Sequence, residues 1–393
     1  MLRRTARNDT TVRAYKYRLY PNKDQSILLC KTFGCARKVY NLLLSERLSL
    51  YEQYKNDFTQ LNKQKYRTPA TLKQSYPYLS EVDSLALANA QCNLAAAFSN
   101  FFAGRADKPT YKKKRSKQSY TTNNQNGSVR IESGKLRLPK IGFVKIKLHR
   151  ELPDGVIKSV TVSFTATGKF FASILVEIEA TPTDRIVPKK ALGLDYSSPE
   201  LYVDNQGTIP EYPRYFRKLE AKLAQEQRKL SRMKQFSKNW YKQKRKAAKV
   251  HEKIANMRKD FLDKLSYKLA EEYDAIAVED LDMRAMSQRL HLGKSTYDNG
   301  FGQFRHMLEY KLRDRGKQLV VVDQLLPSSK RCSICGYKNA ALRLEDRVWT
   351  CPQCGTVLDR DVNAAVNLRL EGIEILNRGT RGDSLSRAKP GIP

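Results

Sequence analysis

Apolar positions in the first hundred residues follow a helical spacing, apart from one short segment at the start. Residues 13–19 alternate between apolar and polar side chains, which predicts a strand that Pro21 and Asn22 bring to an end. Over 24–54 the apolar residues recur at intervals of three and four, and 83–102 shows the same helical character. The pattern therefore predicts one strand followed by a helical unit.

The pattern changes to short strands further along the chain. A basic run at 109–119 and a polar, turn-rich segment at 121–128 mark the boundary of the helical unit. Beyond it the sequence predicts strands at 129–131, 135–138, 144–148, 157–164 and 170–178. These short strands favour a small antiparallel barrel. If the N-terminal strand joined that barrel, the helical unit would be an insertion within it.

A third pattern, in which strands alternate with helices, begins at Ala191. Its expected elements are a strand ending at Asp195, a second strand at 201–203 followed by a turn, a long helical stretch at 214–270, a strand at 275–278, a helix at 301–315 and a strand at 319–322. No glycine or proline interrupts 214–270. This alternation predicts a layered α/β domain.

Length and composition change this picture in two ways. At 393 residues the chain exceeds one ordinary core, and about 150 residues per domain suggests two or three units. Hydrophobic residues make up 40%, which favours folded cores over disorder. The net charge of +33, from 73 Lys and Arg against 40 Asp and Glu, requires an extended anionic partner, and nucleic acid fits best.

A membrane surface is the competing anionic partner. No segment approaches the roughly 18 uninterrupted apolar residues of a membrane-spanning helix. The N-terminus is basic, and polar residues follow it in place of the apolar segment of a secretory signal. We therefore expect a protein of the prokaryotic cytosol or nucleoid.

The long helical stretch carries most of the argument for nucleic acid. Between 214 and 270 there are nineteen Lys and Arg and five Asp and Glu, with Phe236, Trp240 and Tyr241 among them. Such a surface suits contact with a phosphate backbone and aromatic contact with bases, although a solvated helix face can have a similar charge. The sequence identifies no residue that reads a particular base.

Four cysteines form the clearest local motif. Cys332 and Cys335 form one closely spaced pair, Cys351 and Cys354 form another, fifteen residues separate the pairs, and a glycine follows each. Two intervening residues let both thiolates of a pair face one ion, and four thiolates complete a tetrahedron with no open position. The spacing predicts a structural zinc site, with two disulfides as the alternative that a reducing compartment disfavours.

Three carboxylates lie at predicted strand ends or at the start of a predicted segment, where α/β folds commonly place functional residues. Asp195 and Glu279 each end a predicted strand, and Asp361 opens the segment 362–368. Phosphodiester hydrolysis uses hard oxygen ligands for two Mg²⁺ ions about 4 Å apart. Spacing alone leaves open a second interpretation, in which each acid caps a helix or lies in a solvated turn.

These segments, in this order, resemble the split RuvC nuclease domain of the TnpB family, the OrfB-type transposon-encoded RNA-guided endonucleases related to type V CRISPR effectors. The resemblance covers nearly the whole chain. It rests on Leu192-Gly193-Leu194-Asp195, Val278-Glu279-Asp280-Leu281, the four cysteines, Leu358-Asp359-Arg360-Asp361-Val362-Asn363-Ala364-Ala365, Ser237-Lys238-Asn239-Trp240, 256–261, 327–331, Tyr17-Arg18-Leu19-Tyr20-Pro21 and Arg37 with Tyr40-Asn41.

The resemblance implies a multi-domain α+β fold. A wedge-like antiparallel β-barrel at 1–22 and 120–185 would contain an inserted helical recognition domain at 23–119. An RNase H-like RuvC α/β nuclease domain at 186–326 and 358–378 would contain an inserted four-cysteine zinc ribbon at 327–357. Residues 379–393, rich in Gly, Arg and Ser, are expected to form a flexible tail.

The resemblance also implies the site. Its three acids correspond to Asp195, Glu279 and Asp361, which would hold two Mg²⁺ ions, and the family pattern selects Asp361 over Asp359. Glu279 and Asp280 are adjacent on a strand, so only one can face the metals, and the pattern selects Glu279. The chain departs from the family after Asp195, where a glycine two residues later is more usual, which affects the loop but not the carboxylate.

Our leading hypothesis is an RNA-guided, Mg²⁺-dependent DNA endonuclease. Family members bind a guide RNA from their own transposon end, recognise a short motif beside the double-stranded DNA target, and cut where the guide pairs. One alternative is an RNA-guided DNA-binding protein that does not cleave, which the three intact acids argue against. A second alternative is a transposase or structure-specific nuclease that uses no guide.

Overall fold

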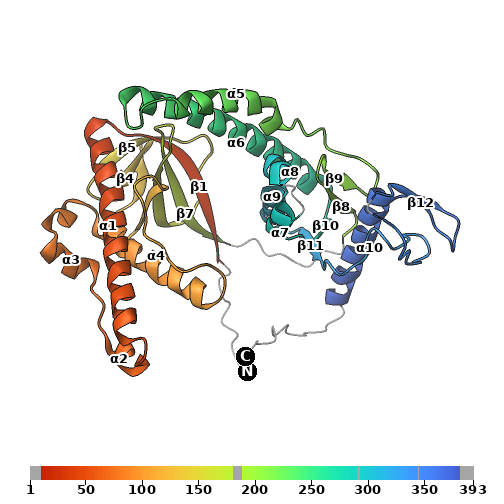
Figure 1. Ribbon diagram of the computed structural model, residues 1–393, viewed down its shortest axis with the longest axis horizontal. Coiled ribbons are helices and arrows are strands. Elements are labelled where there is room, and N and C mark those ends of the chain that lie inside the picture. Colours follow the sequence, from red (N-terminus) through yellow and green to blue (C-terminus); the bar gives the residue numbers. More distant parts are fainter. Residues whose placement is uncertain (1–9, 180–187, 290–292, 344, 381–393) are drawn as a thin grey trace. The chain divides into compact units, whose positions relative to one another are not determined.

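The computed structural model describes residues 10–179, 188–289, 293–343 and 345–380, which fall into two units, Met1–Ala180 and Thr181–Pro393 (Figure 1). Among these residues, none of the helices combines the length and the apolar character needed to cross a lipid bilayer. The tail predicted at 379–393 lies outside the described residues from 381 onward.

The first unit is built on one antiparallel sheet of seven strands in the order β2-β6-β7-β1-β5-β4-β3. The strands are β1 (Thr10–Tyr20), β2 (Gln118–Asn123), β3 (Arg130–Glu132), β4 (Lys135–Leu138), β5 (Gly142–Lys147), β6 (Val156–Phe164) and β7 (Phe170–Glu179). Because β1 pairs with both β5 and β7, the helices between β1 and β2 are inserted into the sheet. Among the described strands no pairing joins β2 to β3, so the closed barrel stays a prediction.

Helices cover one part of this sheet. They are α1 (Lys23–Tyr54), α2 (Phe58–Lys63), α3 (Pro69–Ser75), a 3₁₀ turn (Pro77–Glu81) and α4 (Ser84–Phe102). The Asn22 side chain caps α1 by accepting from the Gln25 amide, and the Asp83 side chain caps α4. The Phe33 ring of α1 lies 5.7 Å from Tyr120 and 6.5 Å from Phe170 of the sheet. Both predicted long helices are confirmed.

Strand β2 was not predicted, because its residues are polar. The segment 118–123 pairs with β6 along its whole length, whereas the sequence pattern placed a basic run and a turn there. Tyr120 and Thr122 alternate into the core and are 5% and 0% exposed. Threonine and tyrosine favour strands through side-chain packing rather than through hydropathy, so apolar alternation missed this edge strand.

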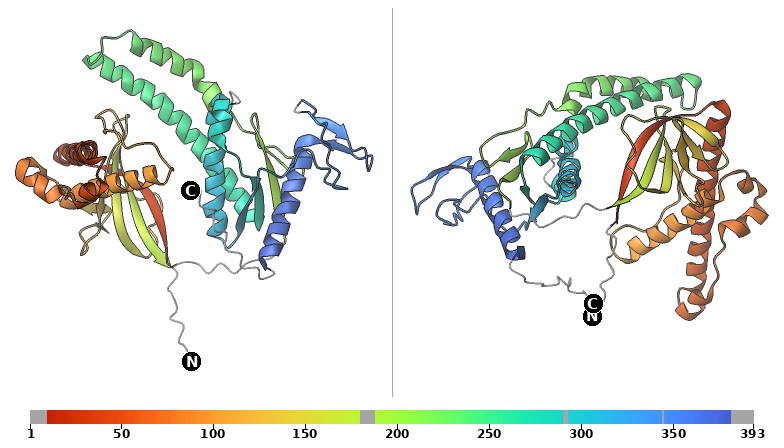
Figure 2. Two further views of the ribbon diagram at one scale, coloured as in Figure 1. Left: turned by 60° about the horizontal axis from the view of Figure 1, so that its bottom comes forward. Right: turned by 180° about the vertical axis from the view of Figure 1, so that it is seen from behind.

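The second unit is a layered α/β structure, as predicted. Its sheet has the order β11-β10-β8-β9, with β8 (Ala191–Ser197), β10 (Ala275–Glu279) and β11 (Gln318–Val322) parallel and β9 (Leu201–Asp204) antiparallel to β8. Helices α6 (Lys238–Glu272) and α9 (Phe301–Arg313) lie on one face, and α10 (Arg360–Thr380) lies on the other (Figure 2).

The remaining elements of this unit are α5 (Tyr215–Ser231), α7 (Met283–Arg289), α8 (Gly293–Asn299), β12 (Val348–Thr350) and β13 (Val357–Asp359). The single helical stretch predicted at 214–270 is wrong in one respect, because 232–237 interrupts it and makes α5 and α6 a helical hairpin. Ser237 caps α6 by accepting from the Trp240 amide, and Phe236 before it has a φ of 67°. Ser237 thus begins the second helix, and the left-handed Phe236 turns the chain between the two helices without Gly or Pro.

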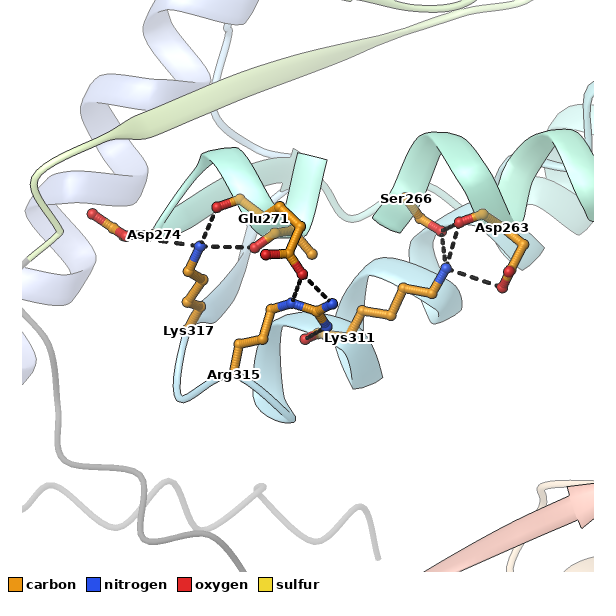
Figure 3. A network of polar contacts seen from close by, with 8 residues as sticks. Asp263, Ser266, Glu271, Asp274, Lys311, Arg315 and Lys317 are labelled. Atoms are coloured by element: carbon orange, nitrogen blue, oxygen red, sulfur yellow. Dashed lines mark hydrogen bonds and ion pairs between the residues drawn. The ribbon is translucent and has the colours of Figure 1, made fainter. Parts of the chain in front are cut away.

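Buried and half-buried polar contacts join α9 to α6 (Figure 3). The Lys311 side chain, 8% exposed, donates from Nζ to the carbonyl and carboxylate of Asp263 and to the Ser266 hydroxyl. Burial lowers the pKa of Lys311, and the hydrogen bonds with Asp263 oppose that shift. Arg315 and Lys317 bind the Glu271 carboxylate and the last carbonyls of α6, respectively. These contacts fix the helices that support the sheet from one side.

Close packing at Gly193 fixes α10 on the other side of the sheet. A side-chain Cβ at Gly193 would overlap with the backbone carbonyl oxygen of Ala365 and lie 2.8 Å from the Arg369 amide nitrogen. The Arg369 guanidinium also donates to the Ala191 carbonyl at 3.0 Å. Helix α10 therefore lies directly on β8, with its first turn near the carboxyl end of that strand.

We expect Gly193→Ala to destabilise the second unit, because the added methyl group meets backbone atoms that cannot rotate away. Overpacking of this kind costs about 1–3 kcal/mol and occasionally more. Gly302→Ala is the matched control, because Gly302 lies in α9 with no atom within 4 Å of an added Cβ. That control should be neutral or stabilising by up to about 1 kcal/mol. Urea unfolding of both variants measures the difference, and equal midpoints would contradict the close approach.

Candidate functional site

Two of the predicted acids lie side by side near the carboxyl ends of β8 and β10, the two inner strands of the second sheet. Strands β8 and β10 are parallel neighbours, and Leu194 pairs in register with Val278. The next residue along each strand is Asp195 and Glu279, respectively. The two carboxylates therefore leave adjacent strands at the same end, which is where α/β sheets gather ligand groups.

The third acid reaches the same place from α10. Asp359 caps this helix, because its Oδ1 accepts from the amides of Asp361 and Val362 at 3.0 and 2.9 Å. The first turn then carries Asp361, while the close contact with Gly193 holds the helix against β8. Residues 166 positions apart in sequence are brought together by this packing.

All three carboxylates line one pocket of about 730 Å³ in the second unit. Four basic side chains share its lining: Lys330, Arg343, Arg347 and Arg360. A pocket lined by both carboxylates and cationic side chains can hold divalent cations against an anionic substrate.

The charge of Asp195 is poorly compensated. Burial, then the negative charges of Asp361 and Glu279, raise the pKa of Asp195 to about 8, and Arg360 acts in the opposite direction. Burial also raises the pKa of Glu279. Neither side chain forms a hydrogen bond or ion pair with another residue of the described segments. A bound cation would supply the missing positive charge.

The competing acids occupy other positions. Asp280 is 60% exposed and forms an ion pair with Arg305 at 3.0 Å, and it does not line the pocket. Asp359 serves as the helix cap and is likewise not part of the lining. Only one acid of each adjacent pair therefore faces the pocket.

Arg347 and Arg360, which the sequence did not single out, hold Asp361. Arg360 donates to Oδ1 of Asp361 at 3.0 Å, and Arg347 donates to Oδ2 at 3.0 Å. Arg347 comes from the segment between the two cysteine pairs and is 67% exposed, whereas Arg360 is 13% exposed. No spacing rule identifies these arginines, because their partner is defined only in three dimensions.

The four cysteines form a second centre. The sulfur atoms of Cys332, Cys335, Cys351 and Cys354 all lie within 4.8 Å of one another, a geometry that could hold a metal ion. The amides of Gly336 and Gly355 donate back to the first carbonyl of their pairs, and both glycines have φ near 80° and 72°. The glycines thus let the backbone turn beneath the sulfurs, as the spacing predicted.

The cysteines are the only group of three or more His, Cys, Asp or Glu gathered this closely within the described segments. The three carboxylates line the pocket with more open spacing, and both oxygens of Asp361 already accept from arginines. The three acids thus line one pocket without forming a compact ligand cluster like that of the cysteines.

Two buried asparagines connect the cysteine segment to α10. Asn363 and Asn367 are 2% and 5% exposed and lie one helical turn apart. Both donate to the carbonyl of Arg331, at 2.8 and 2.6 Å, and Asn363 accepts from the Ser333 amide. They fix the backbone that enters the first cysteine pair against the start of α10.

Three family models match parts of the chain. A family model described as "Probable transposase" (OrfB, IS605) matches 173–290, a model described as "Cas12f1-like, TNB domain" matches 301–368, and one described as "Helix-turn-helix domain" of the same OrfB family matches 11–56.

Whole-chain relatives decide the family. A Streptomyces pristinaespiralis protein named "Putative RNA-guided DNA endonuclease" is 37% identical over 92% of this chain and 89% of its own length. The chain belongs to the TnpB family. A second relative, "Putative RNA-guided DNA endonuclease InsQ" of Escherichia coli (strain K12), is 30% identical over 94% of both chains.

The fold of this TnpB-family chain is similar to that of one solved structure. The chain titled "Cryo-EM structure of the Cas12f1-sgRNA-target DNA complex" matches with a TM-score of 0.57 and 13% identity, covering 92% of this chain and 99% of that one. At this identity the likeness concerns the fold alone.

In this TnpB-family chain, two hydrogen bonds and one ring contact hold the loop after Asp195. Nδ2 of Asn299, which is 2% exposed, donates to the Tyr196 hydroxyl at 3.1 Å and to the Ser198 carbonyl at 3.2 Å. The Tyr196 ring packs 4.8 Å from Phe301. A buried asparagine and an aromatic contact thus support the loop beside the pocket.

Proposed function

We propose that the protein is an RNA-guided, Mg²⁺-dependent DNA endonuclease encoded by a transposon. The observation that carries the proposal is the single pocket lined by Asp195, Glu279 and Asp361. The names of the two long relatives agree with it. We further propose that the second unit has the RNase H-like RuvC arrangement and that the first unit has the wedge and recognition roles.

The donor set fits magnesium. Carboxylate oxygens are the ligands that Mg²⁺ prefers, and Asp195 and Glu279 have no protein partner among the described residues. When bound, two Mg²⁺ ions would activate the attacking water and stabilise the leaving oxygen of the phosphodiester. Asp195 must lose its proton to act as a ligand, and its raised pKa makes that step depend on pH.

The arginines have a separate role in this proposal. Arg347 and Arg360 compensate Asp361 in the protein without substrate, and they lie on the lining of the same pocket. The same two guanidinium groups could donate to the phosphate oxygens of a nucleic acid in this pocket. Planar bidentate donors suit that contact better than a lysine ammonium does.

The proposal that RNA and DNA are the partners is supported by the charge of the chain and by its family. A net charge of +33 and the basic helices α5 and α6 suit a phosphate-rich partner. In the proposal a guide RNA from the transposon end pairs with double-stranded target DNA next to a short motif. Base pairing then supplies sequence information, and the protein contacts mainly the backbone.

We also propose that the four-cysteine cluster holds one Zn²⁺ with a structural role. Four thiolates within reach of one ion fill a tetrahedral site and leave no open position for substrate. Its support of Arg347 and of the 328–333 segment links it indirectly to the pocket.

Purification of the protein from cells that carry its native locus tests the proposed function. Co-purifying RNA is sequenced, and a plasmid library that matches the RNA is incubated with the complex and Mg²⁺. Cleavage next to one shared motif supports the proposal. Bound RNA without cleavage favours the binding-only alternative, and cleavage without RNA favours a guide-free nuclease.

The pH dependence of Mg²⁺ binding is a separate prediction. The pKa of Asp195 in the folded protein is about 8, above its ordinary value of 3.8, so the folded state retains a proton that the unfolded chain has lost. Without Mg²⁺, the free energy of unfolding should therefore fall as pH rises from about 4 to about 8. Because Mg²⁺ binds the ionised form, the rise in Tm that it produces should grow over the same window and level off above about pH 8.

Thermal unfolding at a series of pH values, with and without Mg²⁺, measures this effect. Asp195→Asn removes the titrating group, so its Mg²⁺-induced rise in Tm should be small and should not vary with pH. A rise in the unaltered protein that is constant across the window would contradict a metal role for Asp195.

A further inference from the structure

The end of the α5–α6 hairpin carries an aromatic cluster that the proposed nuclease site does not use. Phe236 and Tyr241 flank Trp240, with ring centroids 5.6 and 5.1 Å from it. Phe236 is 53% exposed and Tyr241 is 55% exposed. The cluster belongs to none of the buried apolar clusters of the described residues, and it lies at the end of the two helices far from the sheet of the second unit (Figure 2).

The backbone presents these rings at some cost. Phe236 has a φ of 67°, which bulky residues rarely adopt. Ser237 caps the helix that follows, so Trp240 and Tyr241 lie in its first turn. The Gln243 side chain, 4% exposed, donates to the Glu226 carbonyl and carboxylate and thereby joins the two helices just behind the rings. A strained residue in a firmly anchored turn indicates that the exposed ring has a use beyond packing.

The charge around the rings identifies the chemistry of a ligand. Ten of the 22 residues from 228 to 249 are Lys or Arg, and none is Asp or Glu. The Lys244 ammonium lies 4.8 Å from the centre of the Trp240 ring. Exposed flat rings in so basic a segment match a nucleobase with its flanking phosphates, because the bases can stack while the phosphates pair with lysines.

We propose that Phe236, Trp240 and Tyr241 form a stacking site for an unpaired base of the bound RNA. This inference rests on the proposed function, in which RNA is the partner held before any target arrives. A folded RNA exposes unpaired bases in loops and ends, where aromatic side chains commonly engage them. A paired duplex would offer only its backbone to the lysines, because its bases are already stacked on one another.

The test compares two short single-stranded RNA probes, an oligouridine and the same chain with abasic riboses. Both have the same phosphates, and only the first can stack. Fluorescence anisotropy in Mg²⁺-free buffer gives each Kd for the full-length protein, and quenching of Trp240 fluorescence reports the contact itself. Trp349 is 7% exposed, so it adds a nearly constant background. We expect the uridine probe to bind about tenfold tighter or more.

Phe236→Asn is the decisive variant. Asparagine tolerates a positive φ better than most residues do, so the turn should persist while the ring is lost. The preference for the uridine probe should shrink to about twofold. Phe236→Tyr should restore it. Lys238→Gln is the matched control for charge, since it should weaken the binding of both probes equally. It should also reduce the salt dependence of binding by about one phosphate contact.

Each outcome has a defined meaning. Equal binding of the two RNA probes by the unaltered protein overturns the inference, and so does an Asn variant that keeps the preference. A base preference seen with the matching DNA probes but not with RNA assigns the site to DNA and overturns it as stated. Binding is measured without cleavage, so failure of the nuclease proposal would leave a base preference intact, and cleavage by a protein that shows no preference would refute this inference alone.

Discussion

Asp361→Ala is expected to abolish DNA cleavage while the protein still folds and binds RNA. The Asp361 carboxylate lies on the lining of the pocket with Asp195 and Glu279, and no other acid of α10 does. Loss of one metal-binding carboxylate removes several kcal/mol of transition-state stabilisation, so the rate should fall about a thousandfold or more. The measurement is single-turnover cleavage of a guide-matched DNA at saturating Mg²⁺.

The protein should still fold, because Asp361 is itself 24% exposed and loses only its ion pairs with the exposed Arg347 and the largely buried Arg360. The Arg347 partner is 67% exposed, and a surface ion pair of this kind contributes about 0–1 kcal/mol. The helix cap belongs to Asp359, which remains. Removal of a negative charge beside Arg347 and Arg360 makes the pocket more positive, so nucleic acid affinity should be kept or rise.

Asp359→Ala is the matched control, two residues away in the same sequence. It removes the α10 cap and should cost about 1 kcal/mol of stability, yet it should still cut DNA at a temperature where the variant is folded. If Asp361→Ala cut at the unaltered rate, or if Asp359→Ala were the inactive variant, the assignment of the third acid would be wrong.

The sequence predicted the elements whose signal is local. The helices α1 and α4 have caps and regular apolar spacing, and strands β8 and β10 are short runs with buried apolar residues. Strand β10 ends at Glu279 as predicted, whereas β8 continues two residues beyond Asp195 to Ser197. Both the cysteine cluster and the alternation of strands with helices depend on spacing, which a sequence displays directly. Strand β2 and the break at Phe236 were missed because polar pairing and a left-handed backbone leave no hydropathy pattern.

The site shows the same division. The acids could be listed from the sequence, but nothing in it places α10 against β8, and that contact depends on Gly193 lying under the Ala365 carbonyl. The arginines on Asp361 and the Asn299 contacts to the loop arise only after packing. Local patterns thus identify the candidate acids, whereas their convergence and the charge balance around them depend on tertiary packing.

The segment between the two cysteine pairs contributes Arg347 to the lining of the pocket of the three acids. Arg347 lies between the cysteine pairs, in a segment whose buried cluster contains only Cys332, Leu342, Trp349, Cys351 and Leu358, with Cys335 packed against it. So small a core cannot hold a chain of this length by burial alone. If the four sulfurs bind a metal ion, as proposed, the position of Arg347 next to Asp361 depends on that ion.

Cys332→Ser is accordingly expected to lower the zinc content and to unfold the segment 327–357. Structural zinc contributes about 10–16 kcal/mol to the folding of small domains, and a serine hydroxyl cannot replace a thiolate ligand. The zinc content, measured by atomic emission, should fall well below one ion per chain. Limited proteolysis should cut within the segment, and Trp349, 7% exposed in the folded protein, should become accessible to a fluorescence quencher.

Cys92→Ser is the control for loss of a thiol, since Cys92 is exposed and lies outside the cluster. It should keep full zinc content and resist proteolysis. Because α10 stays anchored to β8 through Gly193, Cys332→Ser should retain most of the unfolding transition of the second unit while it loses cleavage through misplacement of Arg347 and the pocket rim. A Cys332→Ser protein with full zinc content and an intact segment would refute the four-thiolate site, whereas loss of zinc with normal cleavage would show that the pocket does not depend on it.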